Sequence, residues 1–187
     1  MRKYRTIEMK RLSAEEFRAA EKQPLVVVLD DVRSLYNVGS LFRTADSFRV
    51  GKLILCGITA TPPHAEIHKT ALGAEESVEW EYFPSAVEAV ATLKSQGYRM
   101  LAVEQAEGSK MLHTLTASPD AFAPRCAIVL GNEVKGVNQA VVDQCDGCIE
   151  IPQLGTKHSL NVSVAGALVI WEFTKQWLMR NEENQKK

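Results

Sequence analysis

Short apolar runs without a polar interruption constrain the fold of this chain most. Two of them, Leu25–Leu29 and Cys126–Leu130, contain no charged or amide side chain. Strands of this kind are buried on both faces, which is typical of parallel sheets covered by helices. The first run is rich in β-branched residues and bounded by polar ones, so we interpret it as a strand and not as part of a helix. The sequence therefore predicts an α/β fold, a parallel sheet with helices on both faces.

The rest of the chain alternates between helix and strand patterns. Ser13-Ala14-Glu15-Glu16 is a capping box and opens a predicted helix that ends near Lys22. Further helices are predicted at Ser40–Phe48, His64–Ala71, Ser85–Gln96, Asn138–Cys145 and Ser159–Arg180. Further strands are predicted at Lys52–Cys56, Val78–Phe83, Arg99–Glu104 and Cys148–Ile151, and loops at Asp31–Gly39 and Leu115–Pro124.

A length of 187 residues fits one domain. We place this domain at 24–180, after an N-terminal extension with a short helix at 1–23 and before a polar, disordered tail at 181–187. No apolar run reaches the roughly 18 residues of a spanning helix. The charged start, Met1–Lys10, has no apolar stretch behind it, which does not fit a secretory signal. We expect a soluble, cytoplasmic protein without a membrane partner.

The formal net charge of −1 gives no global support for nucleic-acid binding. The charge is uneven, however, because five basic residues stand against Glu8 alone within the first eleven positions: Arg2, Lys3, Arg5, Lys10 and Arg11. A local basic arm can hold phosphates while the rest of the chain stays acidic. A solvated, frayed terminus explains the same pattern equally well.

Cysteine spacing leaves one alternative open. Cys145 and Cys148 form a C-x-x-C, which occurs in thiol redox couples and as half of zinc sites. A zinc site needs two more ligands, and the four histidines are scattered along the chain. The pair also follows a predicted helix, whereas redox pairs of the thioredoxin type lie at a helix N-terminus. We expect reduced thiols and no metal.

Ligands of parallel α/β sheets bind outside the carboxyl ends of the strands, and three polar, glycine-bearing segments follow predicted strands here. The first runs from Asp31 to Arg43, with Asn37, Gly39 and Arg43 as its notable positions. Gly39 is expected to let the chain turn into the helix. An arginine near a helix N-terminus opposes the helix dipole, so Arg43 suggests a functional role there, although an exposed surface arginine is the simpler alternative.

The second and third segments follow the strands that end at Leu130 and Ile151. In the second, Gly131 and Gly136 bracket a charged loop that lets the backbone approach a ligand closely. Its spacing matches neither a Walker loop nor a dinucleotide-binding loop. In the third, Ser159 is expected to cap the last helix, and Asn161 places an amide in its first turn, where burial requires a hydrogen-bond partner.

Taken in order, the patterns N-x-G-x-x-x-R, G-N-E-x-x-G and I-P-x-x-G-x-x-x-S-L-N-V-S-V-A resemble the three motifs of the SpoU family of RNA ribose methyltransferases, in the SPOUT superfamily. The resemblance extends from about Pro24 to about Trp177. It implies a C-terminal deep trefoil knot, which sequence reading alone could not indicate because knots are rare. It also implies a homodimer held partly by the last helix, with active sites that draw on both subunits, and S-adenosylmethionine as the cofactor.

The resemblance assigns roles to individual residues. Arg43 would stabilise the ribose alkoxide electrostatically, since an arginine is normally always protonated. Asn37 would hold the catalytic loop or the ribose, and Glu133 would position the loop or orient Arg43 across the dimer. Ser159 and Asn161 would form a hydrogen-bonded floor, and Ser159 would contact the target phosphate. The cofactor would be bound by Val103, Glu104, Gln105, Gly131, Asn132, Ile151 and Leu160.

The implied substrate is tRNA or rRNA, and the residues that we expect to contact it are Arg2, Lys3, Arg5, Arg33 and Lys157. Many family members carry a further RNA-recognition domain, whereas only about 23 residues precede the first predicted strand here. Asn37-Val38-Gly39-Ser40 is closer to members that act on guanosine in the tRNA D-loop or on rRNA than to those that act on the wobble ribose. The alternatives are a catalytically silent RNA-binding protein of the same fold and a generic nucleotide-binding domain.

Overall fold

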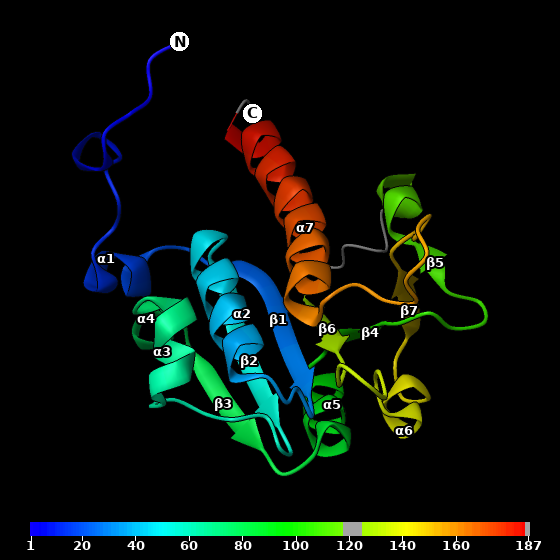
Figure 1. Cartoon of the computed structure of the whole chain (residues 1–187). Coiled ribbons are helices and arrows are strands. Elements are labelled where there is room, and N and C mark those ends of the chain that lie inside the picture. Colours follow the sequence, from blue (N-terminus) through cyan, green and yellow to red (C-terminus); the bar gives the residue numbers. More distant parts are fainter. Residues whose placement is uncertain (118–124, 186–187) are drawn as a thin grey trace.

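The computed structural model describes residues 1–117 and 125–185. Its centre is one parallel sheet of seven strands in the order β3-β2-β1-β6-β4-β7-β5 (Figure 1). The strands are β1 Gln23–Asp30, β2 Val50–Cys56, β3 Trp80–Phe83, β4 Arg99–Val103, β5 Lys110–Met111, β6 Cys126–Leu130 and β7 Gly147–Glu150. The predicted parallel α/β sheet is confirmed, and only the two-residue β5 was not expected.

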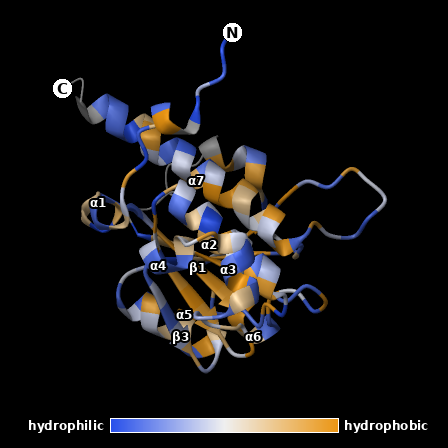
Figure 2. Ribbon diagram, turned by 60° about the vertical axis from the view of Figure 1, so that its left-hand side comes forward, coloured by the Kyte–Doolittle hydropathy of each residue, from blue (hydrophilic) through white to orange (hydrophobic). Residues whose placement is uncertain are grey.

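Helices lie on both faces of the sheet, and further helices and 3-10 turns lie outside it (Figure 1). They are η1 Thr6–Glu8, α1 Ala14–Ala19, α2 Leu35–Ser47, α3 Ala65–Ala71, α4 Ala74–Ser77, α5 Ala86–Ser95, η2 Leu112–Ala117, α6 Gln139–Val142 and α7 Val162–Gln185. In β1, Leu25, Val27 and Leu29 pack into the core under α2 and α7, whereas Val26 and Val28 pack into the core under α5 and α6. This alternation explains the uninterrupted apolar run, and Figure 2 shows the central strands as hydrophobic along most of their length.

The loop predicted at Asp31–Gly39 is confirmed for 31–34 and wrong for 35–39, because α2 begins at Leu35. Ser34 caps it, with its hydroxyl accepting from the backbone N–H of Asn37 at 3.3 Å. Gly39 therefore lies inside the helix and makes no turn into it. A Cβ at Gly39 would lie under 3.0 Å from both Thr70 Oγ1 and the carbonyl oxygen of Ile67, so this glycine allows α2 and α3 to pack closely. Arg43 lies in the second half of α2, away from its N-terminus.

The boundaries of the last helix also differ from the prediction. Helix α7 begins at Val162, and Ser159 does not cap it. The side chain of Asn161 accepts from the backbone N–H of Ser163 at 3.0 Å and takes that place. The helix continues through Gln185, so the tail that we expected to be disordered is helical from 181 to 185. Its sequence contains neither glycine nor proline to end a helix.

Other expectations hold with shorter boundaries. The capping box of Ser13 and Glu16 is confirmed, although α1 ends at Ala19 and not near Lys22. Helices α3 and α5 are confirmed, whereas α6 has only four residues. Of the loop predicted at Leu115–Pro124, the part up to Ala117 belongs to η2, and 118–124 lie outside the described residues. None of the helices in the described ranges is both long and apolar enough to span a bilayer.

Candidate active site

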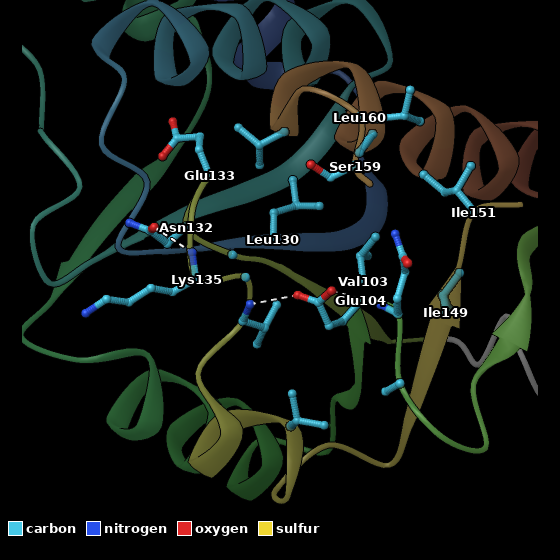
Figure 3. A pocket seen from close by; sticks show the side chains of 18 of the residues that line it. Val103, Glu104, Leu130, Asn132, Glu133, Lys135, Ile149, Ile151, Ser159 and Leu160 are labelled. Atoms are coloured by element: carbon cyan, nitrogen blue, oxygen red, sulfur yellow. Dashed lines mark hydrogen bonds between the residues drawn. The ribbon is translucent and has the colours of Figure 1, made fainter. Parts of the chain in front are cut away.

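A cavity of about 910 Å³ opens where β4, β6 and β7 end (Figure 3). Val103, Leu130 and Ile149 form its inner wall, and the loops that follow these three strands form its sides. This is the carboxyl edge of the sheet, where ligands of parallel α/β proteins bind. All seven residues predicted to bind the cofactor line it: Val103, Glu104, Gln105, Gly131, Asn132, Ile151 and Leu160.

The loop after β6 is held in shape by its own polar groups. The Asn132 side chain donates to the carbonyl of Asp31 at 2.8 Å and accepts from the backbone N–H groups of Val134 and Lys135. Asn132 and Gly136 also form a backbone bridge that closes the loop. The Asn132 side chain thus shapes the rim of the cavity and has few positions left for a ligand.

Glu104 ties the end of β4 to this loop. Its Oε2 accepts from the backbone N–H of Val137 at 3.0 Å, as Figure 3 shows, and its Oε1 accepts from the N–H of Gln105 at 2.8 Å. Gly136 has a positive φ of 71°, and a Cβ there would collide with Glu104 Oε2. Gln105 in turn donates through Nε2 to the carbonyl of His158 at 2.7 Å, so the three loops form one wall.

The wall of the cavity is acidic. Four carboxylates and a single lysine are among its lining residues: Glu104, Glu107, Glu133, Asp143 and Lys135. Aliphatic side chains fill the space between them. Such a surface suits a flat apolar group that carries positive charge and does not suit a polyphosphate.

Glu133, Asn37 and Asn161 form a hydrogen-bonded chain at the edge of the cavity. Asn37 Nδ2 donates to Glu133 Oε1 at 2.9 Å, and Asn161 Nδ2 donates to Asn37 Oδ1 at 3.1 Å. Glu133 also accepts from the backbone N–H groups of Arg33 and Ser34, both at 3.0 Å. It therefore holds the entry to α2 within one chain.

These contacts keep Glu133 ionised. Burial alone would raise its pKa, but hydrogen bonds from the Arg33 backbone, the Asn37 side chain and the Ser34 backbone outweigh burial, and the pKa is lowered. A carboxylate that is already saturated with donors is a poor general base. Its chemistry is that of a fixed negative charge that orients its neighbours.

The predicted catalytic residues do not all meet in one chain. Glu133 and Ser159 line the cavity, Asn37 is bonded to Glu133, and Asn161 is bonded to Asn37. Arg43 is exposed on α2 and lines a different cavity, beside the N-terminal segment. Within the described residues its guanidinium has no hydrogen bond or ion pair.

The residues predicted to bind RNA fall into two groups. Arg33 is exposed directly before α2, where its backbone contacts Glu133, and Lys157 is exposed in the loop that precedes His158 and Ser159 of the cavity. Arg2 and Arg5 instead lie in the N-terminal arm and pair with Glu8 at 3.1 and 3.7 Å, and Lys3 is exposed there. Only the first group lies beside the cavity.

Ser163 is a residue of this site that the sequence analysis did not single out. Its hydroxyl donates to Asn161 Oδ1 at 2.6 Å and lies 3.5 Å from Asn37 Oδ1. Its position two residues after Asn161, in the first turn of α7, is the signal that could have identified it.

The thiols of the C-x-x-C are half-buried. Burial raises the pKa of Cys145 to about 12 and also raises the pKa of Cys148. Because the thiolate is the nucleophile and the metal ligand, burial disfavours the reactive form of both thiols. In the ranges that the structure describes, no three histidine, cysteine, aspartate or glutamate side chains are grouped closely enough to hold a metal ion.

Comparison with known proteins agrees with this geometry. The chain is 30% identical over 160 residues to the 23S rRNA (guanosine-2'-O-)-methyltransferase RlmB of Neisseria meningitidis, covering 86% of this chain and 62% of the relative. It is 29% identical to the tRNA (guanosine(18)-2'-O)-methyltransferase of Thermus thermophilus, covering 91% of this chain and 84% of the relative. The chain thus spans less than two thirds of the ribosomal-RNA relative.

Solved structures share the fold. The A. aeolicus TrmH/SpoU tRNA modifying enzyme superimposes with a TM-score of 0.78 at 23% identity, over 90% of this chain and 84% of that one. AviRb from Streptomyces viridochromogenes, solved in complex with AdoMet, gives 0.74 at 22% identity, over 86% and 63%. The family model of the SpoU rRNA Methylase family matches residues 24–171. The chain therefore belongs to the SpoU rRNA Methylase family.

Proposed function

We propose that this protein transfers a methyl group from S-adenosylmethionine to a ribose 2′-hydroxyl of tRNA or rRNA. The observation that carries the proposal is the cavity at the ends of β4, β6 and β7, which collects all seven residues expected to bind the cofactor and has Glu133 and Ser159 on its wall. Family membership and the substrates named for its relatives support the same reaction.

The residues of the cavity fit the cofactor. S-adenosylmethionine carries a positively charged sulfonium and no phosphate, and the wall carries four carboxylates and one lysine. The adenine ring would pack between aliphatic side chains, including Ile149, Ile151 and Leu160, with its polar edge on backbone groups of the loops. When bound there, S-adenosylmethionine would supply an electrophilic methyl group.

The protein side chains would activate and place the ribose. A ribose hydroxyl is a poor nucleophile until its proton is lost, here to solvent water, and the Arg43 guanidinium would stabilise the developing negative charge on its oxygen. Glu133 and Asn37 would fix the start of α2, and Asn161 would fix the start of α7, so that the hydroxyl meets a rigid surface. Arg33 and Lys157 would hold phosphates beside the cavity.

A homodimer would bring Arg43 to a cavity. Arg43 does not line the cavity of its own chain, so the partner's cavity is the site that it would serve. One face of α7 exposes Val164, Leu168, Trp171 and Leu178, which are spaced by three, four or seven residues and form an apolar stripe. Burial of this stripe in a symmetric interface would place two composite sites around one axis.

The C-terminal trefoil knot is part of the same proposal. In the family it forms where the segment after β7 passes through a loop. The hydrogen bond from Gln105 to the carbonyl of His158 joins the two loops that such a crossing would involve and supports the proposal.

Methyl transfer from labelled S-adenosylmethionine tests the function directly. Total tRNA and ribosomal RNA are offered separately, and the modified ribose is mapped by its resistance to alkaline cleavage. We expect one 2′-O-methylated site in one of the two pools. Arg43→Ala should lose turnover by at least about 100-fold and keep cofactor binding. If wild type binds the cofactor but methylates neither pool, the enzyme proposal fails and a silent RNA-binding protein becomes the better description.

A further inference from the structure

A second cavity, of about 750 Å³, lies between the N-terminal segment and helices α2 and α4. One side consists of Lys10–Ala14 and Phe17, and the other consists of residues of α2, Arg49 in the turn after it, the end of α3, the α3–α4 turn and α4. Figure 1 shows α1 beside α4, near the C-terminal end of α2. We call this cavity the arm groove. It is separate from the cavity at the strand ends and shares no lining residue with it.

The arm groove is basic although the whole chain is slightly acidic. Four cationic side chains line it, and the only carboxylate among its lining residues is Asp46; the cations are Lys10, Arg11, Arg43 and Arg49. Asp46 Oδ1 accepts a hydrogen bond from Ser77 Oγ at 2.8 Å and forms no ion pair with these cations. The local charge therefore favours a polyanion.

The cations of the groove are available to a ligand. Lys10, Arg11 and Arg43 are exposed, and within the described residues none of them forms an ion pair. Arg2 and Arg5 of the same arm, in contrast, are paired with Glu8. Arg49 is held in place by the ring of Trp177, 5.3 Å away, and by the carbonyl of Glu21 at 3.4 Å, so its charge has a fixed position.

We propose that the arm groove binds the phosphodiester backbone of the substrate RNA, with Lys10, Arg11 and Arg49 contacting phosphates next to the nucleotide that Arg43 addresses. The inference rests on the proposed function, because it is the role of Arg43 at the ribose that brings RNA to α2. The phosphates on one side of that ribose would then lie in the groove, between the N-terminal segment on one side and α2 and α4 on the other. Backbone contacts of this kind position a strand without reading its sequence.

The test is the salt dependence of RNA binding by the Lys10→Gln/Arg11→Gln double variant. The probe is a fluorescein-labelled uridine dodecamer, followed by anisotropy from 50 to 400 mM KCl. Each lost phosphate contact to a single strand lowers the slope of log K against log salt by about 0.7, so we expect a decrease of about 1.4 and an affinity loss on the order of ten-fold at 0.1 M salt. The matched control is Lys69→Gln/Lys110→Gln, which removes two exposed lysines outside the groove. An unchanged slope in the first variant, or an equal decrease in the control, would overturn the proposal.

Two further measurements separate this inference from the proposed function. Calorimetry with S-adenosylmethionine should give the same affinity for both double variants and wild type, because neither pair lines the cofactor cavity. If the wild-type protein transfers no methyl group but the salt slope of the Lys10→Gln/Arg11→Gln variant falls as expected, the RNA-binding groove is supported and the methyltransferase proposal is rejected. If the wild-type protein transfers methyl groups and the slope of the variant is unchanged, the methyltransferase proposal is supported and the groove is rejected. Inorganic phosphate is also titrated alone. If the double variant loses saturable phosphate binding but keeps its RNA binding, the groove is a site for small anions and the proposal is overturned.

Discussion

The side chains of Asn37 and Asn161, which are 124 positions apart in the sequence, are joined by a hydrogen bond of 3.1 Å from Nδ2 of Asn161 to Oδ1 of Asn37. The other end of the Asn37 amide donates to Glu133, so its orientation is fixed from both sides. Asn161 Oδ1 meanwhile caps α7. One amide pair therefore connects the start of α2, the start of α7 and the loop after β6.

The first prediction concerns this pair. Asn161→Asp keeps an oxygen that can cap α7 but replaces the donor to Asn37 with an acceptor, so two oxygens face each other. We expect the free energy of unfolding to fall by about 1–3 kcal/mol. In an Asn37→Ala background the same substitution should cost less than about 0.5 kcal/mol, because the opposing oxygen is gone. Urea unfolding of the four proteins measures the coupling, and additive effects would contradict it.

The second prediction concerns pH and Glu133. The folded pKa of Glu133 lies below the ordinary glutamate value of 4.5, so its contribution to stability is present above about pH 4.5 and is lost as the pH falls through the folded pKa. Glu133→Gln should lower the free energy of unfolding by about 1–2 kcal/mol at pH 7. The difference in free energy of unfolding between the variant and wild type, measured by urea unfolding, should become smaller as the pH falls towards about 3.5.

Glu107→Gln is the control for this experiment, since it removes an exposed carboxylate from the wall of the same cavity. It should change stability by less than about 0.5 kcal/mol at either pH. If the loss in free energy of unfolding of Glu133→Gln does not depend on pH, packing and not the charge of Glu133 stabilises the start of α2.

The sequence could predict that the residues expected to bind the cofactor lie together at one edge of the sheet. Strand ends are marked by the change from apolar to polar residues, and a parallel sheet gathers its strand ends at one edge. The family resemblance assigned Val103, Gly131 and Ile151 to the cofactor, and all three lie at or directly after a strand end and line the cavity. The family motifs then identify the polar residues around them.

The position of Arg43 could not be predicted in this way. The sequence suggested that Arg43 lies near a helix N-terminus because Gly39 resembled a turn, but the cap is Ser34 and the helix starts four residues before Gly39. Whether a glycine serves a turn or a close helix contact depends on what packs against it, here Thr70 and Ile67 of α3. Sequence near Gly39 carries no information about that partner.

The third prediction tests this interpretation of Gly39. Alanine is the better helix former by about 1 kcal/mol, yet Gly39→Ala should lower the free energy of unfolding by about 1–2 kcal/mol, because its Cβ meets backbone of α3 that cannot move aside. Gly166→Ala in α7 is the matched control. Its Cβ would meet the ends of the Leu41 and Leu130 side chains at 2.7 Å, which can shift, so we expect a change within about 0.5 kcal/mol. A stabilised Gly39→Ala would mean that α2 and α3 are not in close contact.

The fourth prediction tests whether Arg43 serves the cavity of the partner. Mixed dimers are purified through two different tags, with Arg43→Ala on one chain and Leu160→Trp on the other, where the indole is introduced to fill the cofactor cavity. Calorimetry first establishes that Leu160→Trp alone no longer binds S-adenosylmethionine and that Arg43→Ala alone still does.

Each variant homodimer should be inactive, because one lacks the arginine at both sites and the other lacks the cofactor. If the proposed composite sites exist, the open cavity of the Arg43→Ala chain would face the intact arginine of the Leu160→Trp chain in the mixed dimer, and one of the two sites would be complete. We expect roughly half of the wild-type rate per dimer. If each site belonged to a single chain, neither chain of the mixed dimer would hold both the arginine and an open cavity, and no methyl transfer would be observed. Because Arg43 lies outside the cavity of its own chain, we expect the first result.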